Sequence, residues 1–157
     1  MRAFLVSAFL LLPGVSLSDP STRLVFPVTG SHVSSPFGVR LDPLTNIPRH
    51  HGGIDLPAPT GTPVRALMEG TVIYRDTLHS YGSLVVLRHN DGITTHYGHL
   101  SAVLVELGEL VKAGQILGAV GSTGRATGSH LHLEVRRNGA TEDPLSYLPY
   151  ISQKGVG

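Results

Sequence analysis

The chain has 157 residues and a formal net charge of +1, and this length allows one hydrophobic core, with or without a targeting segment. Charged residues make up only 15% of the chain, and 19 glycines and 11 prolines divide it into short segments, which excludes a coiled coil or an acidic disordered tail. The lack of cysteine excludes a disulfide framework, a thiolate zinc finger and a cysteine nucleophile.

Residues 1–18 have the layout of a secretory signal peptide. Arg2 supplies the positive charge, residues 3–12 form an apolar run, and small residues precede the predicted cleavage site after Ser18. The apolar run is too short to cross a bilayer as a helix, which takes about 20 residues, so we expect no stable membrane anchor. We predict an exported mature chain, residues 19–157, that is periplasmic or extracellular. Its basic and acidic residues are equal in number, and this balance indicates no nucleic-acid partner.

The mature chain has short β-rich segments separated by Gly, Pro, Asn and Asp, and no long stretch of helical period. Asn90-Asp91-Gly92 predicts a tight hairpin turn, because Asn and Gly tolerate positive φ angles, so the strands on either side should be antiparallel neighbours. The one predicted helix is a single turn, Pro144–Leu148, which Asp143 can cap. We therefore predict a single-domain, all-β fold. In chain order, its predicted strands are Leu24–Val28, Val64–Leu67, Thr71–Tyr74, Leu84–Arg88, Ile93–Tyr97, Gln115–Val120 and Leu131–Arg136.

Histidine is abundant, with nine residues, and imidazole both binds metals and transfers protons near neutral pH. His51 and Asp55 stand four residues apart in a segment too rich in glycine for a stable helix. A turn or irregular strand there would bring both side chains to one point. Alone this pattern is weak, since a surface histidine followed by a solvated aspartate also explains it.

A second histidine pattern is more specific. Residues 130–135 alternate polar and apolar, so on a strand His130, His132 and Glu134 share one face and the apolar residues share the other. Two imidazoles two residues apart on a strand can act on one metal site, either as two ligands or as one ligand and one proton carrier.

A third histidine pattern lies at the end of the second strand of the predicted hairpin. If that strand is regular, Tyr97 and His99 face one way and His96 faces the other, so His96 and His99 cannot serve the same site. Histidine and aspartate without cysteine suit a catalytic zinc with an open position for water. A non-haem iron site of two histidines and a carboxylate is the competing assignment, which composition does not exclude. A Ser-His-Asp hydrolase is also open on composition, although the sequence has no G-x-S-x-G segment.

Six segments between about residues 25 and 149 carry a family resemblance. In order they are PVTGSHVSSPFGVR, HHGGIDLPAPTGTPVRA, GTVIYRD, SYGSLVVLRHNDGITTHYGHLS, LVKAGQILGAVGSTGRATGSHLHLEVRRNG and DPLSYL. Together they resemble the lysostaphin/LytM-type family of zinc metallopeptidases, which cut peptidoglycan cross-bridges. The resemblance implies a catalytic domain over these residues, with a duplicated, antiparallel, β-sandwich-like fold.

The resemblance also implies the site residues. The zinc ligands, for one zinc ion per chain, fall on His51 and Asp55 of the H-x-x-x-D motif and on His132, the second histidine of H-x-H. The two catalytic histidines that are not ligands fall on His130 and on His99 of the Y-x-H-L motif. One of them would take the proton of water, and the other would bind the oxyanion or protonate the leaving amine.

Residues beside these positions have two interpretations each. His50 directly precedes the first ligand, but the spacing to the aspartate favours His51. Glu134 either orients a ligand or forms an ordinary ion pair with a nearby arginine. Arg40 either meets an anionic group of the substrate or forms a surface ion pair. The remaining histidines match no catalytic position, and we expect them to be surface or structural residues: His32, His79, His89 and His96.

The family also contains catalytically dead members that lack ligands and activate amidases. Because all five positions are occupied here, we expect an active zinc endopeptidase acting on peptidoglycan stem peptides and cross-bridges. Some members that cut glycine bridges carry a tyrosine shortly before the first ligand. Residues 41–50 contain none, which weakens the case for a glycine bridge and favours D-alanyl cross-links. The alternatives are a non-catalytic module that binds the wall or regulates amidases, and a hydrolase of another exported peptide.

Overall fold

The computed structural model describes residues 23–42 and 44–149, so the predicted signal peptide lies outside the described residues. Within the described part, the only helical elements are two 3₁₀ turns, and no helix there is long and apolar enough to cross a membrane. The predicted all-β class is confirmed. The strands are β1 (Gly38–Leu41), β2 (Pro48–His51), β3 (Ile54–Pro57), β4 (Pro63–Arg65), β5 (Gly70–Leu78), β6 (Gly82–Arg88), β7 (Ile93–Val103), β8 (Leu110–Val111), β9 (Ile116–Val120), β10 (His130–Arg137) and β11 (Ala140–Glu142), and the turns are η1 (His79–Tyr81) and η2 (Pro144–Ser146).

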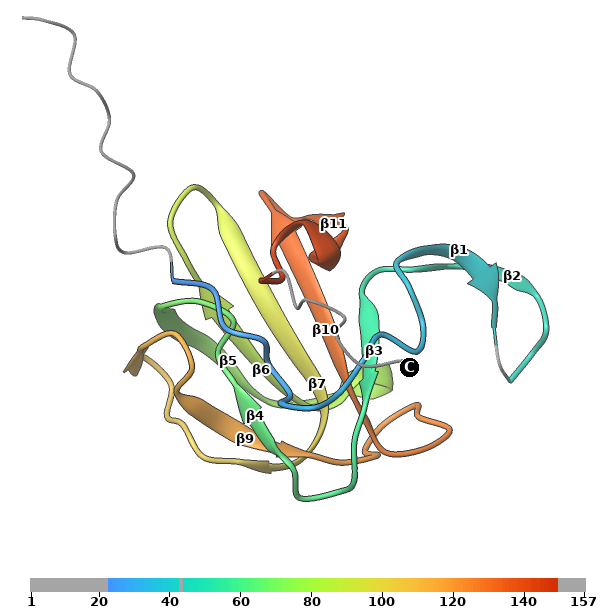
Figure 1. Ribbon diagram of the computed structural model, residues 1–157, viewed down its shortest axis with the longest axis horizontal. Helices are drawn as coiled ribbons and strands as arrows, with labels where there is room; N and C mark the ends of the chain where they lie inside the picture. Colours follow the sequence, from blue (N-terminus) through green and yellow to red (C-terminus); the bar gives the residue numbers. More distant parts are fainter. Residues whose placement is uncertain (1–22, 43, 150–157) are drawn as a thin grey trace, which may run out of the picture.

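The main sheet is antiparallel throughout, in the order β11-β10-β7-β6-β5-β8, with β3 also paired to β10. The long strand β7 joins two parts of the sheet. It pairs with β6 and β10 along its first residues and with β9 from Leu100 to Val103, and β9 in turn pairs with β4. Strands β1 and β2 form a separate hairpin that projects from the body of the molecule (Figure 1).

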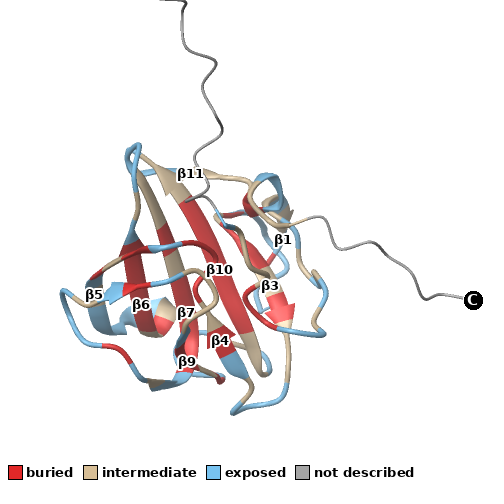
Figure 2. Cartoon of the chain, turned by 60° about the vertical axis from the view of Figure 1, so that its left-hand side comes forward, coloured by how far each residue is buried: buried red, intermediate tan, exposed pale blue. Residues whose placement is uncertain are grey.

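One apolar core fills the space between these strands. In Figure 2 the buried stretches run along β10, β7 and β6. Leu131 and Leu133 of β10 are completely buried, and so are Leu117 and Val120 of β9, in the same cluster. Each fully buried leucine contributes about 1.5–3 kcal/mol relative to an exposed one. Because alternate residues of a strand face opposite ways, the other face of β10 is free to carry its polar residues to a site.

Several predicted elements are confirmed. The turn at Asn90-Asp91-Gly92 has positive φ at Asp91 (57°) and Gly92 (70°), and it joins β6 to β7 as antiparallel neighbours. The predicted helical turn is present as η2, which is shorter than predicted, and the carboxylate of Asp143 accepts a hydrogen bond from the backbone N–H of Leu145 at 3.0 Å.

The predicted strand Leu24–Val28 is wrong. This segment runs alongside the core without joining a ladder, and only isolated backbone bonds hold it, such as that from the N–H of Val25 to the carbonyl of Leu67 at 2.8 Å. Pro27 interrupts it, and proline has no N–H to donate to a neighbouring strand. Strands β1, β2, β3, β8 and β11 were not predicted, because they are short and lack a regular apolar alternation.

A buried hydroxyl in the core gives a test of the packing. Tyr97 is completely buried, and its hydroxyl accepts a hydrogen bond from the backbone N–H of Leu67 at 2.9 Å. The Tyr97→Phe variant leaves that N–H unpaired, so we expect the free energy of unfolding to fall by about 1–3 kcal/mol in urea denaturation. The control is Tyr74→Phe, whose hydroxyl is exposed, with an expected change below about 0.5 kcal/mol. Equal losses in the two variants would contradict this role of the hydroxyl.

Candidate metal centre

Three side chains from three strands bring donor atoms to one point. His51 ends β2, Asp55 lies on β3 and His132 lies on β10. Nδ1 of His132 is 2.9 Å from Oδ1 of Asp55 and 3.1 Å from Nε2 of His51. The third edge of this triangle, from Nε2 of His51 to Oδ1 of Asp55, is 3.2 Å. Both imidazoles are buried, with 8% of each residue exposed.

This donor set fits a metal ion. Tetrahedral zinc with bonds of about 2.0–2.2 Å to nitrogen and oxygen keeps its ligand atoms roughly 3.3 Å apart, and all three edges of the triangle are close to that value. Two imidazole nitrogens and one carboxylate oxygen leave a fourth position open. The same donors also suit other metals that bind nitrogen and oxygen, iron among them.

Glycine between the first two donors makes the cluster possible. Strand β3 pairs with β10 so that Asp55 lies opposite His132. A Cβ atom on Gly53 would overlap the carbonyl oxygen of Leu133 and lie 2.9 Å from Cγ of Glu134. Only glycine therefore allows this turn to pass so close to β10. The sequence alone showed only that these glycines disfavour a helix, and it did not indicate this close approach.

Each candidate histidine ligand is held through its second ring nitrogen. Nδ1–H of His51 donates to the carbonyl of Pro36 at 2.9 Å, and Nε2–H of His132 donates to Oε1 of Glu134 at 3.0 Å. The remaining nitrogen of each ring faces the donor triangle. Glu134 also pairs with Arg136 at 2.6 Å, so it makes both the hydrogen bond and the ion pair that the sequence left as alternatives.

The carboxylates and imidazoles of the triangle shift each other's pKa values. Burial raises the pKa of Asp55, but hydrogen bonds from His132 and His51 outweigh burial and hold the pKa of this carboxyl far below its ordinary value. Burial lowers the pKa of His132, but the carboxylates of Asp55 and Glu134 outweigh burial and raise this pKa to about 9. The two carboxylates thus favour positive charge at His132, the position where a metal ion would bind.

His99 and His130 lie beside the triangle. Their rings are 4.7 Å apart, and the ring of His99 is 5.8 Å from that of His132. Nδ1–H of His99 donates to the carbonyl of Thr123 at 2.7 Å, and Nδ1–H of His130 donates to that of Gly128 at 2.8 Å. Both rings therefore keep Nε2 for other partners. The structure thus brings together all five residues that the resemblance indicated.

The predicted strand geometry at His99 is wrong. A regular strand would turn Tyr97 and His99 to the same face, but Tyr97 is in the core and His99 lies near His132. His99 has a φ of 62°, in the left-handed region that residues other than glycine rarely adopt, and this turns its side chain from the core to the site. His96 lies on the site face as well, since it pairs with Glu134 across the ladder, but it is outside the donor triangle.

The remaining histidines lie away from the triangle. His50 is exposed, and its ring packs edge-on against Phe37 at 5.0 Å, so His51 is the histidine that reaches the site. His32 and His79 are exposed. His89 has a structural role, because its Nδ1–H donates to the carbonyl of Glu69 at 2.6 Å and burial lowers its pKa.

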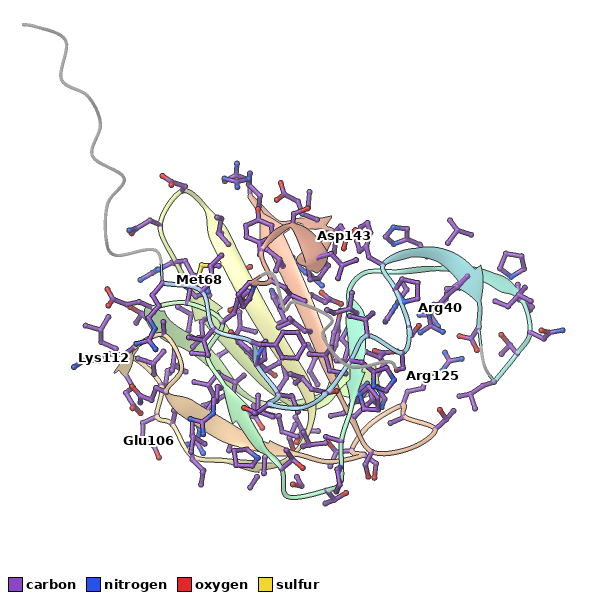
Figure 3. The ribbon with its side chains drawn as sticks, in the orientation of Figure 1. Arg40, Met68, Glu106, Lys112, Arg125 and Asp143 are labelled. Atoms are coloured by element: carbon purple, nitrogen blue, oxygen red, sulfur yellow. The ribbon has the colours of Figure 1, made fainter. Side chains whose placement is uncertain are left out.

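An open groove of about 700 Å³ runs over the triangle, between the β1–β2 hairpin and the loop before β10. Nη2 of Arg125 in that loop pairs with both carboxylate oxygens of Asp42 in the hairpin at 2.9 Å, so an ion pair joins the two walls. In Figure 3 Arg125 lies below Arg40, which belongs to β1 of the hairpin. Arg40 pairs with Oδ2 of Asp55 at 3.5 Å, so its ion pair is with a candidate ligand. The ion pair of Asp42 with Arg125 was not predicted from the sequence, because the two residues are 83 positions apart.

Two relatives match the chain over the site. Mpg, a DD-carboxypeptidase/endopeptidase of Neisseria meningitidis, is 46% identical over 133 residues, or 85% of this chain and 31% of Mpg. The murein hydrolase activator NlpD of Salmonella typhimurium is 39% identical over 98 residues, or 62% of this chain and 26% of NlpD. The chain therefore spans less than a third of the length of either relative.

Solved structures of peptidases also superpose on this chain. A zinc-containing peptidase from Vibrio cholerae superposes with a TM-score of 0.71 and 36% identity, over 78% of this chain and 39% of that one. The catalytic domain of lysostaphin from Staphylococcus simulans superposes with a TM-score of 0.68 and 32% identity, over 74% of this chain and 91% of that one. The family model of peptidase family M23 matches residues 49–144, which include all five site residues. The chain therefore belongs to peptidase family M23, the lysostaphin/LytM type.

Proposed function

We propose that this chain is a zinc endopeptidase that hydrolyses peptide cross-links of bacterial peptidoglycan. The observation that carries the proposal is the convergence of His51, Asp55 and His132 in one donor triangle, with His99 and His130 beside it. We assign the first three residues as the zinc ligands and the other two as proton carriers. Membership of family M23 and the likeness to Mpg and lysostaphin support the reaction class.

The proposed roles follow from which ring nitrogen of each histidine is occupied. A bound zinc ion polarises a peptide carbonyl and lowers the pKa of water toward neutrality. In His99 and His130, Nδ1–H is held by a backbone carbonyl, so the neutral ring presents a bare Nε2 that accepts a proton. After protonation the same Nε2–H donates, either to the oxyanion or to the leaving amine.

Among the residues that the structure describes, Glu134 is the only glutamate lining the groove, and it is not free to act as the base. Its Oε1 already accepts from His132 and Tyr81, and its Oε2 accepts from Arg136. A carboxylate with both oxygens engaged has no free position for a water proton. The proton transfers of the proposed reaction therefore fall to the two histidines.

The opening and the charge of the groove favour a peptide substrate. The groove is partly open to solvent, so an extended peptide can reach the triangle. Arg40, Arg49 and Arg125 line its wall, and they share only two carboxylates, those of Asp55 and Asp42. This excess of cationic side chains suits the free carboxylates of stem peptides. We propose D-alanyl cross-links as the substrate, because residues 41–50 contain no tyrosine and Mpg carries a DD-peptidase name. The corresponding location is the periplasm or the cell exterior.

The alternative is a module that activates other wall hydrolases, and the likeness to NlpD favours it. The complete donor triangle favours the enzyme, because an activator has no need of three convergent donors with an open fourth position.

Purified full-length chain, incubated with sacculi, is expected to convert cross-linked muropeptide dimers to monomers, as measured by chromatography and mass spectrometry. A chelator should stop the conversion, and added zinc should restore it, because the donor triangle supplies the metal site. Sacculus binding without cleavage, together with stimulation of an amidase, would overturn the proposal in favour of an activator. Stoichiometric iron in the purified protein would contradict the choice of metal.

A further inference from the structure

We propose that Tyr81, Glu134 and Arg136 form a positioning cluster that holds His132 with its Nε2 protonated and its Nδ1 turned toward the metal. None of the three residues is a candidate ligand. The inference rests on the zinc site proposed above, and it deepens that proposal by naming residues that set the affinity of the site.

Glu134 is the centre of the cluster. It is 3% exposed, and each of its carboxylate oxygens has two donors within hydrogen-bond distance. Oε1 accepts from Nε2–H of His132 at 3.0 Å and from the hydroxyl of Tyr81 at 2.7 Å. Oε2 accepts from Nε–H of Arg136 at 2.9 Å and from Nη2–H at 2.6 Å. Because all four bonds come from fixed directions, the carboxylate has a single orientation.

The other two residues are also bonded to each other. Nη2–H of Arg136 donates to the hydroxyl oxygen of Tyr81 at 3.0 Å, which closes a ring of three side chains around the carboxylate. Tyr81 comes from η1, whereas Glu134 and Arg136 come from β10, so two separate parts of the fold hold the cluster. The guanidinium also supplies a positive charge that keeps a buried carboxylate ionised.

The cluster decides which nitrogen of His132 is available. An ionised carboxylate only accepts hydrogen bonds, so the nitrogen that faces it must carry the hydrogen. That nitrogen is Nε2, and the lone pair of Nδ1 is then directed at the triangle, 2.9 Å from Asp55 and 3.1 Å from His51. Partners of this kind fix the tautomer and the ring orientation of metal ligands.

The chain contains a matched control for this cluster. On the same strand, Arg137 donates to Glu142 at 3.1 Å and to the hydroxyl of Tyr147 at 3.0 Å. The hydroxyl of Tyr147 in turn donates to Glu142. The three residue types are the same, but side chains of adjacent residues in a strand face opposite ways, and none of these three lines the groove.

The test compares zinc affinity in the two clusters, measured by competition with a chromophoric chelator. Glu134→Gln is expected to weaken zinc binding by about 10- to 100-fold. Tyr81→Phe removes one of the four bonds to the carboxylate, and we expect a loss of about 3- to 10-fold. Glu142→Gln and Tyr147→Phe should bind zinc within about twofold of the unmodified chain.

A spectroscopic readout separates positioning from a general loss of structure. With cobalt in place of zinc, the visible absorption bands report the arrangement of the ligands, and they should change in Glu134→Gln but not in Glu142→Gln. If Glu134→Gln does not fold, as judged by circular dichroism, Tyr81→Phe and its control Tyr147→Phe decide the question.

The outcomes for this inference and for the proposed function differ. An unmodified chain that binds no zinc overturns the proposed zinc peptidase itself. A chain that binds zinc tightly, with Glu134→Gln and Tyr81→Phe binding equally well, overturns only the positioning cluster. Equal losses in both clusters also overturn it, because they would show a general effect of altering an Arg-Glu-Tyr group.

Discussion

The His132→Ala variant is expected to lose zinc binding and peptidoglycan hydrolysis together. Nδ1 of His132 lies within 3.1 Å of both other donors, so the substitution removes one of the three donor atoms of the triangle. Loss of a partner that only orients a ligand costs about 10- to 100-fold in metal affinity, and loss of the ligand itself should cost more than 100-fold. We expect substoichiometric zinc by elemental analysis and no release of monomers from sacculi.

This prediction needs a check on folding and a matched control. The substitution removes the histidine that Asp55 and Glu134 share, and removing one partner from a buried group of charges is destabilising. His51→Ala is the second variant, because His51 has no contact with Glu134. The control is His50→Ala, the exposed neighbour of His51, which should retain zinc and activity. Stoichiometric zinc in a folded His132→Ala variant would contradict the assignment of ligands.

Two parts of the site could be predicted from periodicity. The alternation in residues 130–135 places His132 and Glu134 on one face of β10 and Leu133 in the core, as the structure confirms. The turn before β7 was predictable because positive φ angles favour Asn, Asp and Gly. In both cases the physical signal lies within a few consecutive residues.

The rest of the site depends on contacts between distant segments. Nothing near Tyr81 in the sequence indicates that its hydroxyl reaches Glu134, 53 residues away. The hairpin of β1 and β2 was missed because its strands are mostly exposed, with Val39 79% exposed, so no apolar alternation marks it. The face of His99 was predicted wrongly because its φ of 62° breaks the strand period at one residue.

The His99→Ala and His130→Ala variants are expected to bind zinc normally and to lose most of their activity. Neither residue belongs to the donor triangle, so zinc content should match that of the unmodified chain. Removal of a positioned proton carrier costs about 10²- to 10⁴-fold in rate, and we expect each variant to lose kcat/KM in this range on cross-linked muropeptide dimers. Because the two residues serve one reaction, the double variant should be little slower than the slower single variant.

The combination of zinc content and rate separates the proton carriers from the ligands. A ligand variant such as His132→Ala loses both quantities, whereas a proton-carrier variant loses only the rate. The control is His79→Ala, which replaces an exposed histidine just before Tyr81 and should leave both quantities unchanged. If His99→Ala or His130→Ala loses zinc, that histidine is a ligand. If either one hydrolyses dimers at the rate of the unmodified chain, the proton transfers do not pass through it, and its assignment as a proton carrier is wrong.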